Sequence, residues 1–115
     1  MLTIENNLVG IDQGEEVISD FQSDGELWTG SGAREVRRHV AYSRPYKRAP
    51  RVLAFVQMFD LSNSANARID VQVDEVTRDG FVLVFRTWLD TRVARVRIGW
   101  MSFGELSHDD DWDLY

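Results

Sequence analysis

The sequence predicts an all-β domain, a six-stranded antiparallel β-sandwich, and three observations support this fold class. Apolar and polar residues alternate with a period of two along much of the chain, and no segment keeps a helical repeat over three turns. Clusters of turn-forming residues separate the alternating stretches. With 115 residues, 43% of them hydrophobic and 28% charged, the chain can bury one core but not two. We therefore expect one folded domain.

The first half of the chain contains three expected strands. One lies within residues 8–21, and a second covers residues 36–42, ahead of Pro45 and Pro50. Residues 52–59 are largely apolar at both odd and even positions, as is typical of a strand covered on both faces. This segment is therefore predicted to be a central strand.

The second half of the chain contains a hairpin and a last strand. Residues 67–74 alternate strictly, which predicts one buried and one solvent-facing side. The Asp79-Gly80 pair is a strong turn signal before the apolar residues 81–88, so the two stretches are predicted to pair as a hairpin. The other expected elements are a loop at 60–66, a turn at 89–91 and a strand from 93 to about Gly104.

Charge is distributed unevenly along the chain. The formal net charge of −6 opposes binding to nucleic acid, because phosphate contacts need a surplus of Lys and Arg. Residues 34–51 nevertheless hold a basic cluster, interpreted as a solvated basic strand, with nucleic-acid or polyanion binding as a disfavoured rival. Its members are Arg34, Arg37, Arg38, Arg44, Lys47, Arg48 and Arg51. Residues 1–104 are expected to form the domain, and residues 105–115 an acidic C-terminal tail.

No targeting or membrane segment is expected. Residues 1–7 lack the basic start and apolar run of a signal peptide, and no later stretch has the length needed to cross a bilayer. The protein is therefore expected to be soluble, with no membrane insertion. An extracellular location is expected if it binds glycans.

The residues that could support catalysis or metal binding are sparse. The chain has no cysteine, so disulfides and thiolates are excluded. His39 and His108 lie far apart, without the spacing of a zinc site or a triad, and His39 is interpreted as a surface or interface residue. The aspartates at 109–111 and 113 lack the glycine and glutamate of an EF-hand loop. We expect no enzyme activity, no metal and no cofactor.

Five polar and aromatic residues around the predicted hairpin are candidates for binding a sugar: Arg68, Asp70, Trp88, Asp90 and Arg92. A neutral sugar requires planar donors and acceptors for its hydroxyls and an aromatic surface for the apolar side of its ring. An alternative interpretation places Arg68 and Asp70 on the solvent-facing side of a strand and gives Trp88 a packing role at a strand end.

A series of landmarks from Trp28 to Phe103 resembles the H-type lectin family in its order and spacing, although no single landmark is specific. The landmarks are Trp28-Thr29-Gly30, Arg34-Glu35-Val36, Tyr42-Ser43-Arg44-Pro45-Tyr46, Pro50-Arg51-Val52, Arg68, Gly80-Phe81, Thr87-Trp88, Thr91-Arg92-Val93 and Gly99-Trp100-Met101-Ser102. The resemblance implies a six-stranded sandwich that assembles as a trimer or a pair of trimers, with sites for galactose or N-acetylgalactosamine between neighbouring chains. It also implies binding without catalysis or metal.

The resemblance assigns sugar contacts to particular residues and reveals three departures. Arg68 takes the place of an arginine that bonds sugar hydroxyls, and Trp88 that of a tryptophan that packs on the sugar. The usual acidic residue is replaced by Ser31, a histidine of the snail member by Leu89, and a tyrosine by Ala94. Asp90 is a candidate for the missing carboxylate.

Two further expectations concern assembly. Arg95 and Arg97 alternate with apolar residues, so they are expected either to pair with carboxylates of another chain or to remain solvated on an outer face. An alternative function is a structural trimerisation module whose sugar site has decayed, which Leu89 and Ala94 favour.

Overall fold

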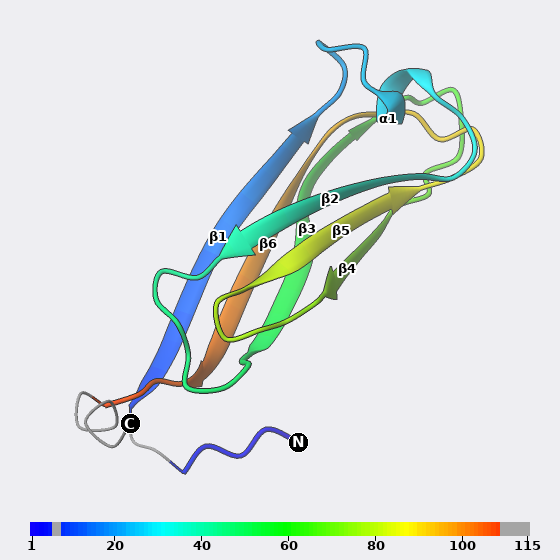
Figure 1. Cartoon of the computed structure of the whole chain (residues 1–115). Helices are drawn as coiled ribbons and strands as arrows, with labels where there is room; N and C mark the ends of the chain where they lie inside the picture. Colours follow the sequence, from blue (N-terminus) through cyan, green and yellow to red (C-terminus); the bar gives the residue numbers. More distant parts are fainter. Residues whose placement is uncertain (6–7, 109–115) are drawn as a thin grey trace.

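A computed structural model of the chain describes residues 1–5 and 8–108, in which six strands form two antiparallel sheets stacked as a sandwich (Figure 1). The prediction of an all-β, six-stranded sandwich is confirmed. One sheet has the order β1 (Val9–Ser19), β6 (Val93–Glu105), β3 (Arg51–Leu61). The other has the order β2 (Arg34–Ala41), β5 (Gly80–Thr87), β4 (Asp70–Asp74), and a short helix α1 (Glu26–Thr29) follows β1.

The core lies between the two sheets and is built mainly by β5 and β6. Each is the central strand of its sheet, and alternate side chains point inward from both. The inward-facing residues are Phe81, Leu83 and Phe85 of β5 and Val96, Ile98 and Trp100 of β6, all buried. Burying each such side chain contributes about 2 kcal/mol, so this double layer is the main source of stability.

Residues 52–59 do form a strand, but the prediction that it is central is wrong. They lie in β3, which pairs only with β6 and is therefore an edge strand. Its outward-facing Leu53 and Phe55 are 56% and 44% exposed. An apolar pattern predicts that one side of a strand is shielded from water. It does not indicate which surface provides the shielding. Within residues 1–5 and 8–108, no layer covers the outer side of β3.

The predicted hairpin is confirmed as β4 paired with β5, although β4 begins at Asp70 rather than at residue 67. The turn between them is closed by the Thr77 amide, which donates to the Gly80 carbonyl at 2.9 Å. Ahead of β4, the Arg68 carbonyl accepts a hydrogen bond from the Thr87 hydroxyl at 2.6 Å instead of joining the strand ladder. This contact holds Arg68 beside the end of β5.

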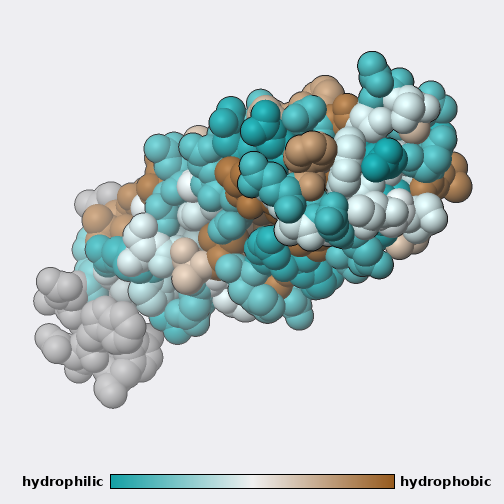
Figure 2. Space-filling model, turned by 90° about the horizontal axis from the view of Figure 1, so that it is seen from above, coloured by the Kyte–Doolittle hydropathy of each residue, from teal (hydrophilic) through white to brown (hydrophobic). Residues whose placement is uncertain are grey.

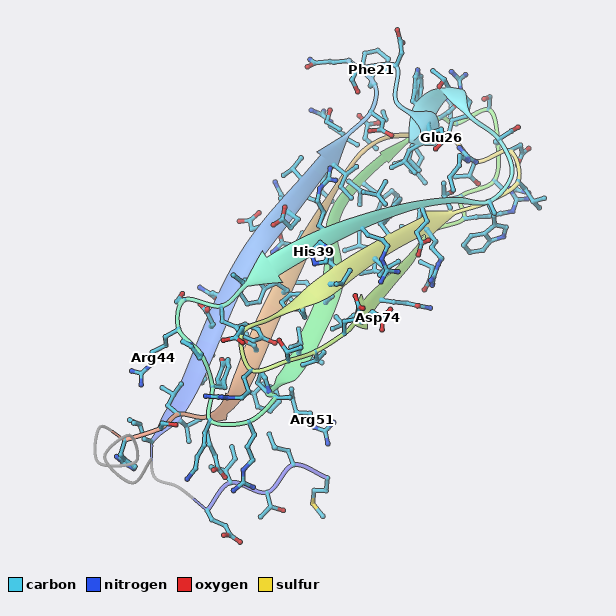
Figure 3. All side chains as sticks on the ribbon, viewed as in Figure 1. Phe21, Glu26, His39, Arg44, Arg51 and Asp74 are labelled. Atoms are coloured by element: carbon cyan, nitrogen blue, oxygen red, sulfur yellow. The ribbon has the colours of Figure 1, made fainter. Side chains whose placement is uncertain are left out.

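Helix α1 and several of the loops between strands lie together at one end of the sandwich. Helix α1 and the loops around it lie at the end opposite the beginning of the chain and the end of β6 (Figure 1). Phe21 and Glu26 mark this end, whereas Arg44 and Arg51 lie toward the other (Figure 3). No helix in the described part of the chain is long and apolar enough to cross a membrane.

The C-terminal end of β6 continues into the packed domain. The Leu106 side chain is buried in the core cluster, and its amide donates to the Leu8 carbonyl at 3.0 Å. Residues 109–115, which hold the aspartates of the expected tail, lie outside the described residues. The tail at 105–115 stays a prediction.

Candidate functional site

Arg68 and Asp90 form an ion pair at the α1 end of the molecule. The Arg68 Nη1 atom lies 2.5 Å from Asp90 Oδ1 and 3.3 Å from the Thr91 hydroxyl. The Arg68 side chain is mostly shielded from solvent, whereas that of Asp90 is mostly exposed. A cation and a carboxylate side by side present both donors and acceptors to a ligand with neighbouring hydroxyls.

Two buried threonines hold this pair in place. The Thr87 hydroxyl donates to the Arg68 carbonyl, and the Thr91 hydroxyl donates to the Asn66 carbonyl, both at 2.6 Å. Both threonine side chains are buried, so these hydrogen bonds are shielded from water. They fix the backbone of residues 66–68 against the turn that joins β5 to β6.

Residues 88–91, named here the 88–91 turn, present an apolar surface next to the ion pair. Trp88 and Leu89 are 40% and 58% exposed. Leu89 has φ of +57°, a left-handed conformation that is costly for a residue other than glycine. Such a conformation persists only where its surroundings enforce it, and it turns the Leu89 carbonyl inward.

Residues 30–33, named here the 30–33 loop, lie against the 88–91 turn. The Gly32 amide donates to the Leu89 carbonyl at 2.9 Å, and Gly32 itself has a left-handed φ of +73°. Ser31 is exposed on this loop. The structure therefore gathers all five predicted site residues at one end: Arg68 contacts Asp90, and the loop that carries Ser31 contacts Leu89.

Two other candidates lie elsewhere. Asp70 is on the outer face of the β2-β5-β4 sheet, where its carboxylate lies 3.8 Å from an Arg86 nitrogen. The Arg92 guanidinium lies 4.2 Å from the Trp28 ring centre, and its Nε donates to the Trp28 carbonyl at 2.9 Å. Neither belongs to the group formed around Arg68, because each is engaged by a different part of the fold.

Arg34 was missed as a residue of this region. It was assigned to a solvated basic strand, and that assignment is wrong because Arg34 is only 5% exposed. Its side chain donates to carbonyls of the 30–33 loop and the 88–91 turn. Its position at the start of β2 gave no composition signal, since Arg34 stands close to exposed arginines in the chain.

A hollow of about 340 Å³ lies beside α1. Phe21 and Trp28 meet edge to face across 5.2 Å in its wall. An ion pair between Arg95 Nε and Asp60 Oδ2, at 3.3 Å, also lines it. Ala94, where the family resemblance expects a tyrosine, completes the lining with Ser19, Gln22 and Leu61.

Arg95 and Arg97 both find carboxylates within the chain. Arg95 pairs with Asp60, and Arg97 Nε lies 3.4 Å from Glu15 Oε2. Among the described residues, no group of three or more His, Asp or Glu side chains is arranged to hold a metal ion.

The family follows from comparison with known proteins. A model of the H-type lectin domain matches residues 37–103, more than half of the chain. The chain belongs to the H-type lectin family. This confirms the resemblance read from the landmarks, and it identifies the sandwich as a lectin-like domain. The residues around Arg68 and Trp88 lie within the matched region, whereas Ser31 and Arg34 precede it.

Relatives of this H-type lectin domain differ in length. A protein of Fuscovulum blasticum named ATP synthase subunits region ORF 7 is 41% identical over 107 residues, covering 92% of this chain and 93% of that protein. Two discoidin-1 polypeptides of Dictyostelium discoideum are each 34% identical over 77 residues, covering 66% of this chain but 30% of the relative. The chain thus spans less than a third of either discoidin-1 polypeptide.

Solved structures share the fold of this H-type lectin domain. Two structures of discoidin II from Dictyostelium discoideum superpose with TM-scores of 0.75 and 0.76, each at 23% identity. They cover 94% and 91% of this chain, and 40% and 39% of the discoidin II chain. The sandwich is therefore the shared feature.

Proposed function

We propose that this domain binds glycans that end in galactose or N-acetylgalactosamine, without catalysis, through Arg68, Trp88, Ser31, Leu89 and Asp90. The observation that carries the proposal is the Arg68–Asp90 pair beside an exposed indole. The guanidinium donates to adjacent sugar hydroxyls, the carboxylate accepts from them, and Trp88 packs against the apolar side of the ring. Membership of a lectin family supports the same chemistry.

Leu89 and Ser31 set this site apart from the pattern expected for the family. Leu89 is exposed and offers apolar contact but no hydrogen bond. Ser31 accepts from a hydroxyl less strongly than a carboxylate does. Asp90 takes over the role of the carboxylate acceptor, so the charge of the site comes from the turn rather than from the 30–33 loop.

The domain is proposed to act as a trimer or a pair of trimers with sites between neighbouring chains. The support is the outer face of the β1-β6-β3 sheet, named here the apolar outer face. Its exposed apolar residues include Ile11, Val17, Leu53 and Phe55. Hydrophobic side chains reach the surface as patches among hydrophilic ones (Figure 2). Contiguous apolar patches commonly mark protein interfaces.

The hollow beside α1 supports sites shared between chains. Five of its lining residues belong to the sheet that carries the apolar outer face: Ser19, Asp60, Leu61, Ala94 and Arg95. A neighbouring chain packed there brings a second wall close to the hollow. Several weak sites on one assembly then bind a glycan surface more tightly than one site does.

The test is titration with galactose and N-acetylgalactosamine of the wild type, of Arg68→Ala and of Arg86→Ala. Arg86 is a matched control because it also forms ion pairs at a protein surface, on the other sheet. Removing a charge-assisted donor from a sugar contact is expected to weaken binding about tenfold or more. We expect Arg68→Ala to lose binding and Arg86→Ala to keep it. Equal binding by all three proteins rules out the assigned site.

The second candidate function is a structural trimerisation module with a degenerate sugar site. Leu89 and Ala94 favour it, because neither offers the polar group that the family resemblance expects. A glycan screen combined with light scattering separates the two functions. A stable oligomer that binds no glycan selects the structural module, whereas sugar binding that depends on Arg68 selects the lectin.

A further inference from the structure

We propose that Arg34 is the positioning residue of the sugar site: its buried guanidinium sets the distance between the 30–33 loop and the 88–91 turn. The inference rests on the proposed function, because these two segments carry Ser31 and the Trp88 to Asp90 residues. Arg34 itself is buried and does not reach a ligand. It acts through the backbone of the residues that do.

The Arg34 side chain joins three separate segments by hydrogen bonds to backbone carbonyls. Its Nε donates to Gly32 at 3.0 Å, and its Nη2 donates to Leu89 at 3.1 Å. Its Nη1 donates to Leu27 at 3.1 Å and to Glu26 at 3.4 Å, which are carbonyls of α1. One planar group thus ties together the loop, the turn and the helix.

Only a guanidinium can make this set of contacts. Arginine has five donors in a rigid plane, whereas a lysine ammonium is a point charge with three donors on a flexible stem. None of the ion pairs found among the described residues involves Arg34, although a buried charge ordinarily requires a carboxylate. Carbonyl oxygens therefore supply its compensation, and this makes its position depend on where those carbonyls lie.

The two segments that Arg34 joins both contain left-handed backbone. Gly32 and Leu89 have φ of +73° and +57°, and the carbonyl of each accepts from Arg34. The Gly32 amide also donates to the Leu89 carbonyl, so this oxygen receives two hydrogen bonds. For Leu89 the conformation is unfavourable without such support. Removing the guanidinium releases the turn that presents Trp88 and Asp90.

Helix α1 provides the anchor on the other side. It has only four residues, and such a short helix is not stable alone. Its buried Leu27 packs in the core, and the Leu27 amide donates to the Asp20 carboxylate at 2.9 Å. Arg34 therefore holds the 30–33 loop and the 88–91 turn at a fixed position relative to α1, which is anchored in the core. Preorganised segments of this kind lose less entropy when a ligand binds.

The first experiment compares galactose binding by wild type, Arg34→Lys and a matched control, Arg78→Lys. The control is suitable because Arg78 also donates from Nε to a backbone carbonyl, that of Tyr46, outside the site. We expect Arg34→Lys to bind about tenfold or more weakly, with Arg78→Lys unchanged. Wild-type affinity in Arg34→Lys overturns the proposal.

The second experiment needs no sugar, so it separates this inference from the proposed function. Amide hydrogen exchange is measured in the same variants. We expect faster exchange in the 30–33 loop and at residues 88–91 of Arg34→Lys, including the Gly32 amide, with the core strands β5 and β6 unchanged. Unchanged loops, or faster exchange throughout the core, overturn the positioning role. If wild type binds no sugar, the proposed function fails and the exchange result still decides whether Arg34 positions the two segments.

Gly32→Ala provides a second variant that leaves the buried guanidinium intact. A Cβ at Gly32 meets no atom within 4 Å, but its left-handed φ is unfavourable for alanine. The substitution therefore strains the contact between the 30–33 loop and the 88–91 turn without disturbing packing. Weaker galactose binding with an intact fold supports the proposal, and wild-type binding contradicts it.

Discussion

The outer face of the β2-β5-β4 sheet is covered by its own charged side chains, whereas the apolar outer face of the other sheet is bare. On the first sheet, Arg37 lies 3.1 Å from Asp74 and 3.3 Å from Glu35, and Arg86 lies 3.1 Å from the same glutamate. These side chains form a network across three strands. The hydrogen bond from Arg37 holds the pKa of Asp74 below its usual value.

The network shields apolar residues that would otherwise face water. Val82 and Val84 point outward from the central strand β5, yet both are buried. Long arginine side chains cover apolar surface with their methylene groups while their charged ends stay solvated. The apolar side chains of this face are therefore covered by charged side chains of the same chain.

Among the described residues, the apolar outer face has no comparable cover. Its two ion pairs, Arg97 with Glu15 and Arg95 with Asp60, lie beside rather than over the exposed Leu53 and Phe55. The two outer faces of the sandwich thus differ in how their apolar side chains are shielded from water. The outer face of the β2-β5-β4 sheet is covered by its own charged side chains. The apolar outer face is suited to contact with another chain.

The largest expected effect comes from placing a charge on the apolar outer face. Leu53→Asp is expected to raise the dissociation constant of the proposed oligomer about 100-fold or more, because an unpaired carboxylate is costly in an apolar interface. Leu53 is exposed in one chain, so folding is retained. His39→Asp, on the exposed charged face, is the control and should not change the mass measured by light scattering. An oligomer that survives Leu53→Asp places the interface elsewhere.

A smaller effect is expected on the charged face. Arg86→Met removes two ion pairs and a hydrogen bond to Gln72, and it should lower the free energy of unfolding by about 1 kcal/mol. Arg44→Met is the control, since Arg44 is exposed and donates to the Ser107 carbonyl at a longer distance of 3.4 Å. Urea unfolding measures both. Equal losses would mean that the network adds nothing beyond an exposed arginine.

The smallest effect concerns the core between the two faces. The Tyr42 ring packs against Phe81 and Trp100, and its buried hydroxyl has no hydrogen-bond partner among the described residues. Tyr42→Phe should therefore stabilise the fold by about 1 kcal/mol or less. Urea unfolding at neutral pH checks this value, and a clear loss of stability would reveal a partner for the hydroxyl.

The same residue predicts a response to alkaline pH. Burial, with a contribution from Tyr46, raises the pKa of Tyr42 to about 12 from 10.0. The unfolded chain therefore releases this proton first, and its contribution to stability is present below pH 10 and lost as pH rises toward 12. Tyr42→Phe should remove this part of the alkaline loss. An identical pH dependence in both proteins would contradict the assignment.

Local patterns predicted most of the strands and part of the site. The hairpin of β4 and β5 follows from alternation on either side of Asp79-Gly80, and these signals act over a few residues. Arg68 and Trp88 were singled out by residue type and by the order of landmarks. Their proximity depends on Thr87, whose hydroxyl reaches back nineteen residues. No periodicity encodes such a contact.

Two errors have a common physical cause. β3 was expected at the centre of a sheet and Arg34 in solvent, and in both cases burial depends on which segments stack in three dimensions. The apolar pattern of β3 is the same whether its outer face meets a helix, a sheet or another chain. An arginine beside other arginines gives no sign that distant carbonyls will surround it.

Period-two alternation and turn residues were enough to establish a small antiparallel sandwich, because these signals arise from neighbouring residues on a pleated strand. The landmark order was enough to indicate a lectin family. Which strands lie at the sheet edges, which face is left bare and which arginine is buried were settled by packing. Those properties depend on contacts between residues far apart in the chain, and such contacts exist only once the two sheets have stacked.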